Sequence, residues 1–219
     1  MPLSAYFQSA LFLIGAAVAL FASAGTFAIA SLWIYLAIWA AVFVASLALL
    51  DPGLLQERMR PGGQPPPLAL KLFTIALFAH FIVAGLDRGR LHFSDGVPEW
   101  LQALGLAVLA AAYVLALWAM RVNRFFSSVV RIQSDRGQFV VTTGPYAFIR
   151  HPGYVAGFLF VLASGIALGS WLAAAFLIVT SLPFLIQRAI TEDRVLLAKL
   201  PGYREYAGRV RWRLIPGVW

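Results

Sequence analysis

Long apolar runs constrain this fold more than any other feature of the sequence. Of the 219 residues, 61% are hydrophobic and only 12% are charged. A helix of about 20 apolar residues crosses the hydrocarbon core of a bilayer. No basic region precedes the first run, which continues almost to residue 50, so we expect it to be retained rather than cleaved as a signal peptide. The sequence therefore predicts an all-α, polytopic integral membrane helical bundle.

We expect about six spans, of which the first two and the last two form hairpins. Gly169 and Ser170 mark the turn of the last hairpin. The segment 51–67 carries several prolines and glycines and is expected to be a loop. His80 lies alone within the third span, where we expect a hydrogen bond to a neighbouring helix rather than a functional role. The expected spans are residues 6–24, 27–50, 68–86, 100–118, 154–168 and 171–186.

The composition excludes several kinds of chemistry. The chain has no Cys, so disulfides, thiolate nucleophiles and Cys-bound zinc are absent, and its three His are too scattered to indicate a metal site. The net charge of +8 would suit nucleic acid, but the basic residues flank the apolar runs, where they match anionic lipid headgroups. We therefore expect membrane lipids as partners, and neither nucleic acid nor a metal.

The charges of the loops predict the orientation in the membrane. The loops after the second and fourth spans and the C-terminal segment are basic, whereas the loop after the third span has two Arg against three acids. Basic loops face the cytoplasm. Six spans then leave both termini in the cytoplasm, and the basic segments 121–150 and 188–219 share one face.

The stretch TTGPYAFIRHPGY, residues 142–154, is the densest polar and turn-forming cluster beside the apolar runs. Gly144 and Pro145 predict a turn, since glycine supplies backbone freedom and proline fixes φ. Arg150 and His151 add a permanent cation and a titratable ring. We expect the active site here, although an interfacial turn whose Arg and His face lipid headgroups explains the same residues.

The second basic segment supplies an acid. Glu192 can accept an ammonium group, and Arg150 and Arg188 can hold a carboxylate. Such a set fits a zwitterionic ligand. On an exposed helix, Glu192 can instead form an i, i+4 pair with Arg188. Asp193 lies one helical step further round, so we expect it to face away from this site and to contribute little to ligand binding.

Several spaced motifs occur in an order that resembles the C-terminal half of the isoprenylcysteine carboxyl methyltransferase family, to which membrane phospholipid methyltransferases are related. The resemblance covers residues 118–216, and the N-terminal spans have no comparable motif. We therefore divide the chain into N-terminal transmembrane helices, 1–117, and a methyltransferase-like membrane region with the cofactor site, 118–219. The motifs are GPYAFIRHPGYVAG at 144–157 and RAITEDRVL at 188–196, followed by Gly202, Tyr203, Tyr206, Val210, Ile215 and Pro216.

The resemblance implies a site for S-adenosylmethionine, a zwitterion with a sulfonium. By that resemblance, Glu192 binds the amino-acid end of the cofactor. Gln138 stands near the position where eukaryotic members have a His, and it can donate a hydrogen bond to the cofactor. Asp193 stands where the family commonly has Glu. The residues that the resemblance implies around the cofactor are Gly144, Pro145, Tyr146, Arg150, His151 and Tyr154.

The function that the resemblance implies is that of an integral membrane, S-adenosylmethionine-dependent methyltransferase acting on a lipid-like or prenylated acceptor. Asn123 and Arg124, at the exit of the fourth span, are candidates for orienting the nucleophile. Arg188 is a candidate for holding an acidic substrate. Snorkelling or helix capping at the interface explains these side chains equally well.

Small residues suggest a route for the acceptor. Gly153, Gly157 and Gly165 leave little bulk along one side of the fifth span. We expect a groove open to lipid along that side, next to the methyl position.

Three other functions fit parts of the pattern. One is a phospholipid or amine N-methyltransferase, which uses a similar outline. Another is a sterol-type membrane reductase that uses NADPH. The third is a lipid-binding or scaffold protein in which the motifs only decorate the interface.

Overall fold

The computed structural model describes residues 3–64 and 67–219, and all regular structure in these residues is helical. The described residues form eight α-helices, which are α1 Leu3–Ala24, α2 Ala30–Leu49, α3 Pro52–Met59, α4 Leu68–Leu86, α5 Glu99–Val122, α6 Pro152–Leu168, α7 Trp171–Lys199 and α8 Tyr203–Arg209. The longest connection between them, residues 123–151 between α5 and α6, contains the 3-10 turn Gly144–Ala147 of the candidate site.

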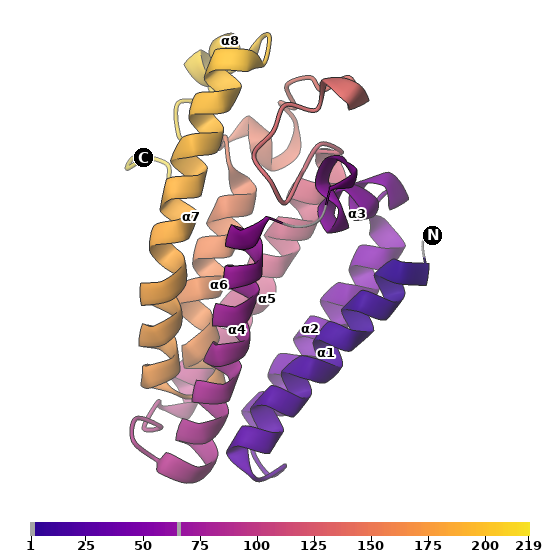
Figure 1. Ribbon diagram of the computed structural model, residues 1–219. Helices are drawn as coiled ribbons and strands as arrows, with labels where there is room; N and C mark the ends of the chain where they lie inside the picture. Colours follow the sequence, from indigo (N-terminus) through magenta and orange to yellow (C-terminus); the bar gives the residue numbers. More distant parts are fainter. Residues whose placement is uncertain (1–2, 65–66) are drawn as a thin grey trace.

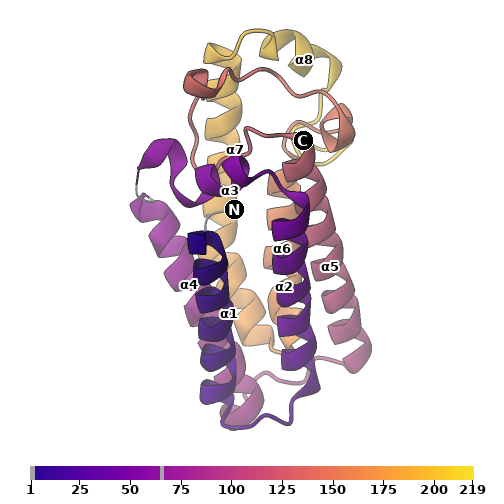
Figure 2. The same ribbon diagram turned by 90° about the vertical axis from the view of Figure 1, so that its right-hand side faces the viewer.

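The predicted all-helical membrane bundle is confirmed. Five helices, α1, α2, α4, α5 and α7, are long and apolar enough to cross a bilayer, and α6 is a shorter apolar helix. The six run side by side in alternating directions (Figures 1 and 2). The start of α1, α3, the segment between α5 and α6, α8 and the C-terminus all lie at one end of the bundle. The polar segments that the sequence placed on one face therefore do meet at one end.

Close packing fixes α6 between α5 and α7. Gly105 of α5 faces the backbone of Ala167, and Gly165 of α6 faces the backbone of Ala174 of α7, so that a Cβ at either glycine would clash. Small residues allow such close helix contacts in membranes. The N-terminal end of α6 lies beside the C-terminal part of α7, where Tyr154 contacts Glu192 and where the site lies.

A buried polar cluster ties four helices together inside the bundle. His80 Nδ1 donates to the carbonyl of Ala173 at 3.0 Å, because a carbonyl can only accept. His80 Nε2 then accepts from Ser164 Oγ at 2.9 Å, and Ser164 Oγ lies 2.7 Å from Tyr35 OH. The expected role of His80, a hydrogen bond to a neighbouring helix, is confirmed.

Two expected boundaries are wrong. The segment 51–67 contains the helix α3, because Asp51 Oδ1 caps it by accepting from the backbone N–H of Gly53 and Leu54 at 2.8 and 3.1 Å, and proline is tolerated at the first helical position. The sixth span continues past residue 186 to Lys199 as one helix, with Pro183 inside it. Neighbouring helices let a transmembrane helix tolerate such a proline.

Candidate functional site

A cavity of about 260 Å³ lies at the polar end of the bundle, among α3, α4, α6, α7, α8 and the segment between α5 and α6. Small-molecule sites typically enclose about 300–1,000 Å³, so this cavity is of the size of a compact ligand site. The sequence-predicted residues on its wall are Asn123, Gln138, Tyr146, His151, Tyr154, Arg188 and Glu192. Whether these residues bind a cofactor stays a prediction.

Tyr154 bridges the two charged residues of α7. Its hydroxyl donates to Glu192 Oε2 at 2.8 Å and accepts from Arg188 Nε at 3.0 Å. In the described part of the chain, Glu192 and Arg188 form no direct ion pair, so the i, i+4 alternative does not hold. The arrangement presents an acid and a cation to the same cavity.

Asp193 points away from the cavity but is not a minor residue. It is fully buried. Its Oδ1 accepts from His151 Nε2 at 3.1 Å and from Tyr203 OH at 3.0 Å, and its Oδ2 accepts from Arg213 Nε at 2.8 Å. Arg150 Nη1 lies 3.3 Å from Oδ1. Asp193 therefore has a structural role, because a buried charge is expensive unless it is paired, and this carboxylate binds several donor groups. Its small expected effect on cofactor binding stays a prediction.

Arg150 differs from the sequence-based expectation. Its guanidinium forms an ion pair with Asp193 and does not line the cavity, whereas His151 does line it. The backbone N–H groups of Arg150 and His151 donate to the carbonyls of Trp212 and Arg213, both at 3.0 Å. The C-terminal tail thus holds the turn that carries His151.

Gly144 and Pro145 lie outside the cavity wall and shape the turn. Gly144 has φ of +59°, and an added Cβ would press on Val122 and Trp118 of α5. Glycine is therefore required there for conformation and for close packing. The turn sets the next residue, Tyr146, against the cavity.

Tyr146 is fixed from both sides. Asn123 Nδ2 donates to its hydroxyl at 3.1 Å, and Tyr206 OH donates to its carbonyl at 2.7 Å. Burial raises the pKa of Tyr146 above the usual range, against the opposing effect of the Asn123 hydrogen bond. Tyr146 is therefore a neutral hydroxyl at physiological pH.

The two remaining predicted residues lie at the rim. Arg124 is exposed, and its guanidinium carbon lies 4.9 Å and 5.7 Å from the rings of Phe125 and Phe139. It does not line the cavity, so it is not placed to orient a nucleophile there. Gln138 lines the cavity, and its Oε1 accepts from the backbone N–H of Gln133 at 2.7 Å, which leaves its amide N–H groups as the donors toward a ligand.

In the described residues, no groove runs along all three glycines from which the sequence predicted one, although Gly153 lines the cavity beside Phe126. Gly165 packs on α7, and Gly157 lies in ordinary contact distance of Leu185. The cavity instead has an apolar wall between α4 and α7, where the rings of Phe73 and Phe184 are 6.0 Å apart. The other apolar residues of this wall are Leu70, Phe126 and Leu185.

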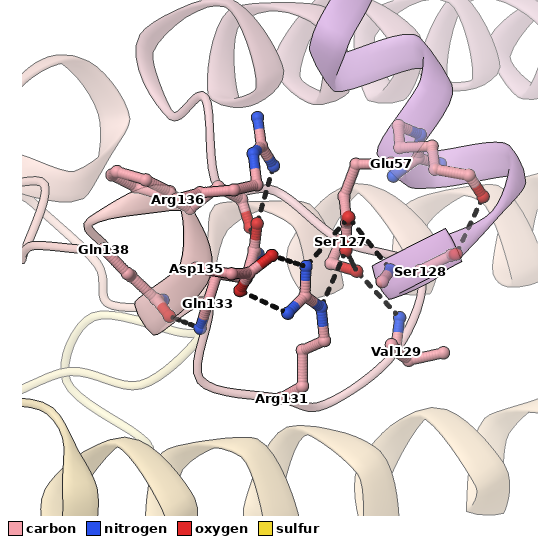
Figure 3. A network of polar contacts seen from close by, with 12 residues as sticks. Glu57, Ser127, Ser128, Val129, Arg131, Gln133, Asp135, Arg136 and Gln138 are labelled. Atoms are coloured by element: carbon pink, nitrogen blue, oxygen red, sulfur yellow. Dashed lines mark hydrogen bonds and ion pairs between the residues drawn. The ribbon is translucent and has the colours of Figure 1, made fainter. Parts of the chain in front are cut away.

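Sequence reasoning missed the contribution of α3. Glu57 accepts from Arg131 through Nε and Nη2, at 3.0 and 2.9 Å, and from Ser127 Oγ at 2.9 Å, as Figure 3 shows. Arg131 Nη1 also donates to Asp135 at 2.8 Å. Arg58, the next residue of α3, lines the cavity. The signal in the sequence was the adjacent charged pair Glu57 and Arg58, in a segment whose prolines and glycines predicted a loop.

The described residues contain no group of three acidic or His side chains that could hold a metal ion. The site is instead a set of separate charges around one cavity, with an apolar wall on one side.

Residues 103–198 match the isoprenylcysteine carboxyl methyltransferase (ICMT) family. A protein-S-isoprenylcysteine O-methyltransferase from Schizosaccharomyces pombe is 28% identical over 109 residues, which cover 49% of this chain and 46% of that protein. A protein of the same name from Tribolium castaneum is 30% identical, over 58% of this chain and 45% of that protein. The cobalt-zinc-cadmium resistance protein CzcN from Cupriavidus metallidurans is 33% identical, over 59% and 56%. The chain spans about half the length of the curated relatives it matches.

Proposed function

Since residues 103–198 match the isoprenylcysteine carboxyl methyltransferase family, we propose that this membrane protein transfers a methyl group from S-adenosylmethionine to the carboxylate of a prenylated or similarly lipidic acceptor. The observation that carries the proposal is a cavity lined both by the polar or charged residues Glu192, Tyr154 and Arg188 and by the aromatic residues Phe73 and Phe184. Such a lining suits one ligand with charges and one with an apolar tail.

The residues present fit the proposed methyl donor. Glu192 faces the cavity with one oxygen bound by Tyr154, and its other oxygen is free to accept from an ammonium group. Asn123, Gln138 and His151 add hydrogen-bonding groups to the wall. When bound, S-adenosylmethionine supplies an electrophilic methyl group on its sulfonium. These side chains position the two reactants, and positioning can contribute about 7 to 11 kcal/mol toward the barrier.

The wall favours a carboxylate over an amine as the acceptor. A carboxylate attacks without losing a proton, whereas an ammonium group needs a base. Arg58 and Arg188 bring two guanidinium groups to the cavity wall. Two cations suit an anionic acceptor, so the geometry supports ester formation better than N-methylation.

The proposed region 118–219 supplies most of the polar wall, but it does not form the cavity alone. Arg58 of α3 and Leu70 and Phe73 of α4 complete the wall. We propose that the N-terminal helices guide the lipidic acceptor while the C-terminal region binds the donor.

The test is a methyl-transfer assay with radiolabelled S-adenosylmethionine and purified protein in lipid nanodiscs. The acceptor panel contains prenylated cysteines, fatty acids and amine-headed lipids. We expect transfer to the acidic acceptors, and binding of S-adenosylmethionine but not NADPH by calorimetry. Binding of NADPH alone would favour a reductase, and binding of neither would favour the scaffold alternative.

A further inference from the structure

The helix α3 brings a guanidinium to the cavity from outside the region that matches the family. Arg58 lies on the wall together with Arg188 of α7, whereas the matched region starts at residue 103. The guanidinium carbon of Arg58 lies 5.1 Å from the centre of the Phe126 ring, which is a cation–π distance. Across the described parts of the chain, no carboxylate lies within ion-pair distance of Arg58 or Arg188. Two cations therefore face the ligand space without a protein counterion.

The position of Arg58 is fixed by neighbouring hydrogen bonds. Ser128 Oγ donates to the carbonyl of Arg58 at 2.8 Å. Glu57, one residue earlier, is held by Arg131 and Ser127 (Figure 3). The partners Ser127, Ser128 and Arg131 all belong to the segment between α5 and α6 and line the cavity. Arg58 is thus placed by the same contacts that shape the wall.

The charge of Arg58 is poorly compensated inside the protein. Burial, followed by repulsion from Arg188, lowers the pKa of the Arg58 guanidinium to about 10. The acid on the wall, Glu192, is already bound by Tyr154. A desolvated charge is expensive unless it is paired, so an anion that enters the cavity relieves this cost.

We propose that Arg58 binds the carboxylate of the methyl acceptor and so selects acidic acceptors. The inference rests on the proposed function, because it names the acceptor group that this site holds. α4, which follows α3, supplies Leu70 and Phe73 to the apolar wall, and Phe126 lies under the guanidinium. An acceptor with its tail along this wall has its acidic head at Arg58.

The chemistry gives Arg58 a particular kinetic role. A bond forms between a carboxylate oxygen and the methyl carbon while the bond from that carbon to sulfur breaks, and the electron pair of the broken bond stays on sulfur. The products are a neutral ester and a neutral thioether, and no proton moves. Arg58 therefore binds the acid more strongly than the ester. Such an interaction lowers KM for the acceptor and assists product release, without accelerating the chemical step.

The first arm of the test is steady-state kinetics with N-acetyl-S-farnesylcysteine as the acceptor. Arg58→Met keeps an unbranched side chain against Phe126 but removes the charge. We expect KM for this acceptor to rise at least about tenfold, the loss of one charged hydrogen bond, while kcat and KM for S-adenosylmethionine change little. Arg58→Lys should restore part of the loss. Arg60→Met, at an exposed residue two positions on, is the matched control and should behave as wild type.

The second arm compares binding of the acid with binding of its carboxamide. Wild type should prefer the acid by at least about tenfold, and Arg58→Met should lose that preference. A rise in KM for S-adenosylmethionine alone would assign Arg58 to the donor and overturn the proposal, as would a preference for the acid that survives in Arg58→Met. If Arg58→Met fails to fold, as judged by thermal unfolding, Arg58→Gln, which also removes the charge, carries the same comparison. If wild type binds the acid more tightly than the carboxamide but transfers no methyl group, the proposed function is wrong, whereas the proposed carboxylate site at Arg58 is supported.

Discussion

At the scale of single residues, two adjacent acids of α7 have different tasks. Successive residues of a helix are rotated by about 100°, so neighbours face different surroundings. Glu192 faces the cavity and contacts Tyr154, whereas Asp193 is buried among His151, Arg213 and other donors. The first acid is placed to bind a ligand, and the second holds His151 and the C-terminal tail in position.

We predict that conservative substitutions separate these two roles. Glu192→Gln should weaken S-adenosylmethionine binding about 10- to 150-fold, the range for a charged hydrogen bond, and leave stability almost unchanged. Asp193→Asn should lower the free energy of unfolding by about 3 kcal/mol, because it leaves buried cations without their carboxylate. Calorimetry of binding and denaturant unfolding measure the two effects. Equal losses of affinity with no loss of stability in Asp193→Asn would show that both acids contact the ligand.

At the scale of elements, the apolar helices were predictable and the polar contacts between elements were not. Apolar length alone placed α4 at residues 68–86, where the structure also has it. The helix α3 was missed because Pro52 and Gly53 read as loop residues, although Asp51 caps them into a helix. Of the family motifs, Tyr146, His151, Tyr154, Arg188 and Glu192 were expected at the site and line the cavity, whereas Tyr203 and Tyr206 line it without having been expected there. The charged partners of Asp193 and Glu57 were not found from the sequence, because His151 and Arg213 lie 42 and 20 residues from Asp193, Arg131 lies 74 residues from Glu57, and no local spacing encodes such pairs.

The contact between α3 and the segment after α5 predicts a pH dependence of stability. Burial acts to raise the pKa of Glu57, but the hydrogen bonds from Arg131, Gly62 and Ser127 outweigh it, so the pKa lies below its ordinary value of 4.5. A carboxyl group whose folded pKa is depressed stabilises the fold above the unfolded pKa and loses that effect as pH falls through the folded pKa.

We therefore expect wild type and Glu57→Gln to differ in stability by a constant amount, about 1 to 3 kcal/mol, from pH 7 down to about 4.5. The difference should shrink at lower pH, where Glu57 becomes protonated in the unfolded and then in the folded protein. Tryptophan fluorescence during denaturant unfolding in detergent measures it. Glu205→Gln, at an exposed site on α8, controls for the change in net charge. A difference that persists unchanged to pH 3 would mean that the ion pair with Arg131 is not its source.

At the scale of the whole molecule, the alternating helices bring the start of α1 and the C-terminal tail to one end of the bundle (Figures 1 and 2), and the segments that line the cavity belong to the same end. The opposite end carries the turn between α4 and α5, where Asp87 is buried and accepts from Ser94 Oγ and from the backbone N–H of Phe93 and Ser94. The basic segments belong to the cavity end. A methyl donor made in the cytoplasm reaches the cavity only if this end is cytoplasmic.

The last prediction concerns the orientation of the bundle in the membrane. Because the sequence has no Cys, a single introduced cysteine is the one thiol that a reagent can label. Single cysteines at Gln64 and Val218 lie at exposed positions, at the cavity end and in the C-terminal tail. Since basic segments stay in the cytoplasm, an impermeant thiol reagent should not label either site in intact cells, and should label both after the cells are opened. Gly96→Cys, in the turn between α4 and α5 where an added side chain meets open space, should be labelled in intact cells. Labelling of Gln64→Cys or Val218→Cys from outside would place the cavity away from the cytoplasm, and the donor would then have no route to Glu192.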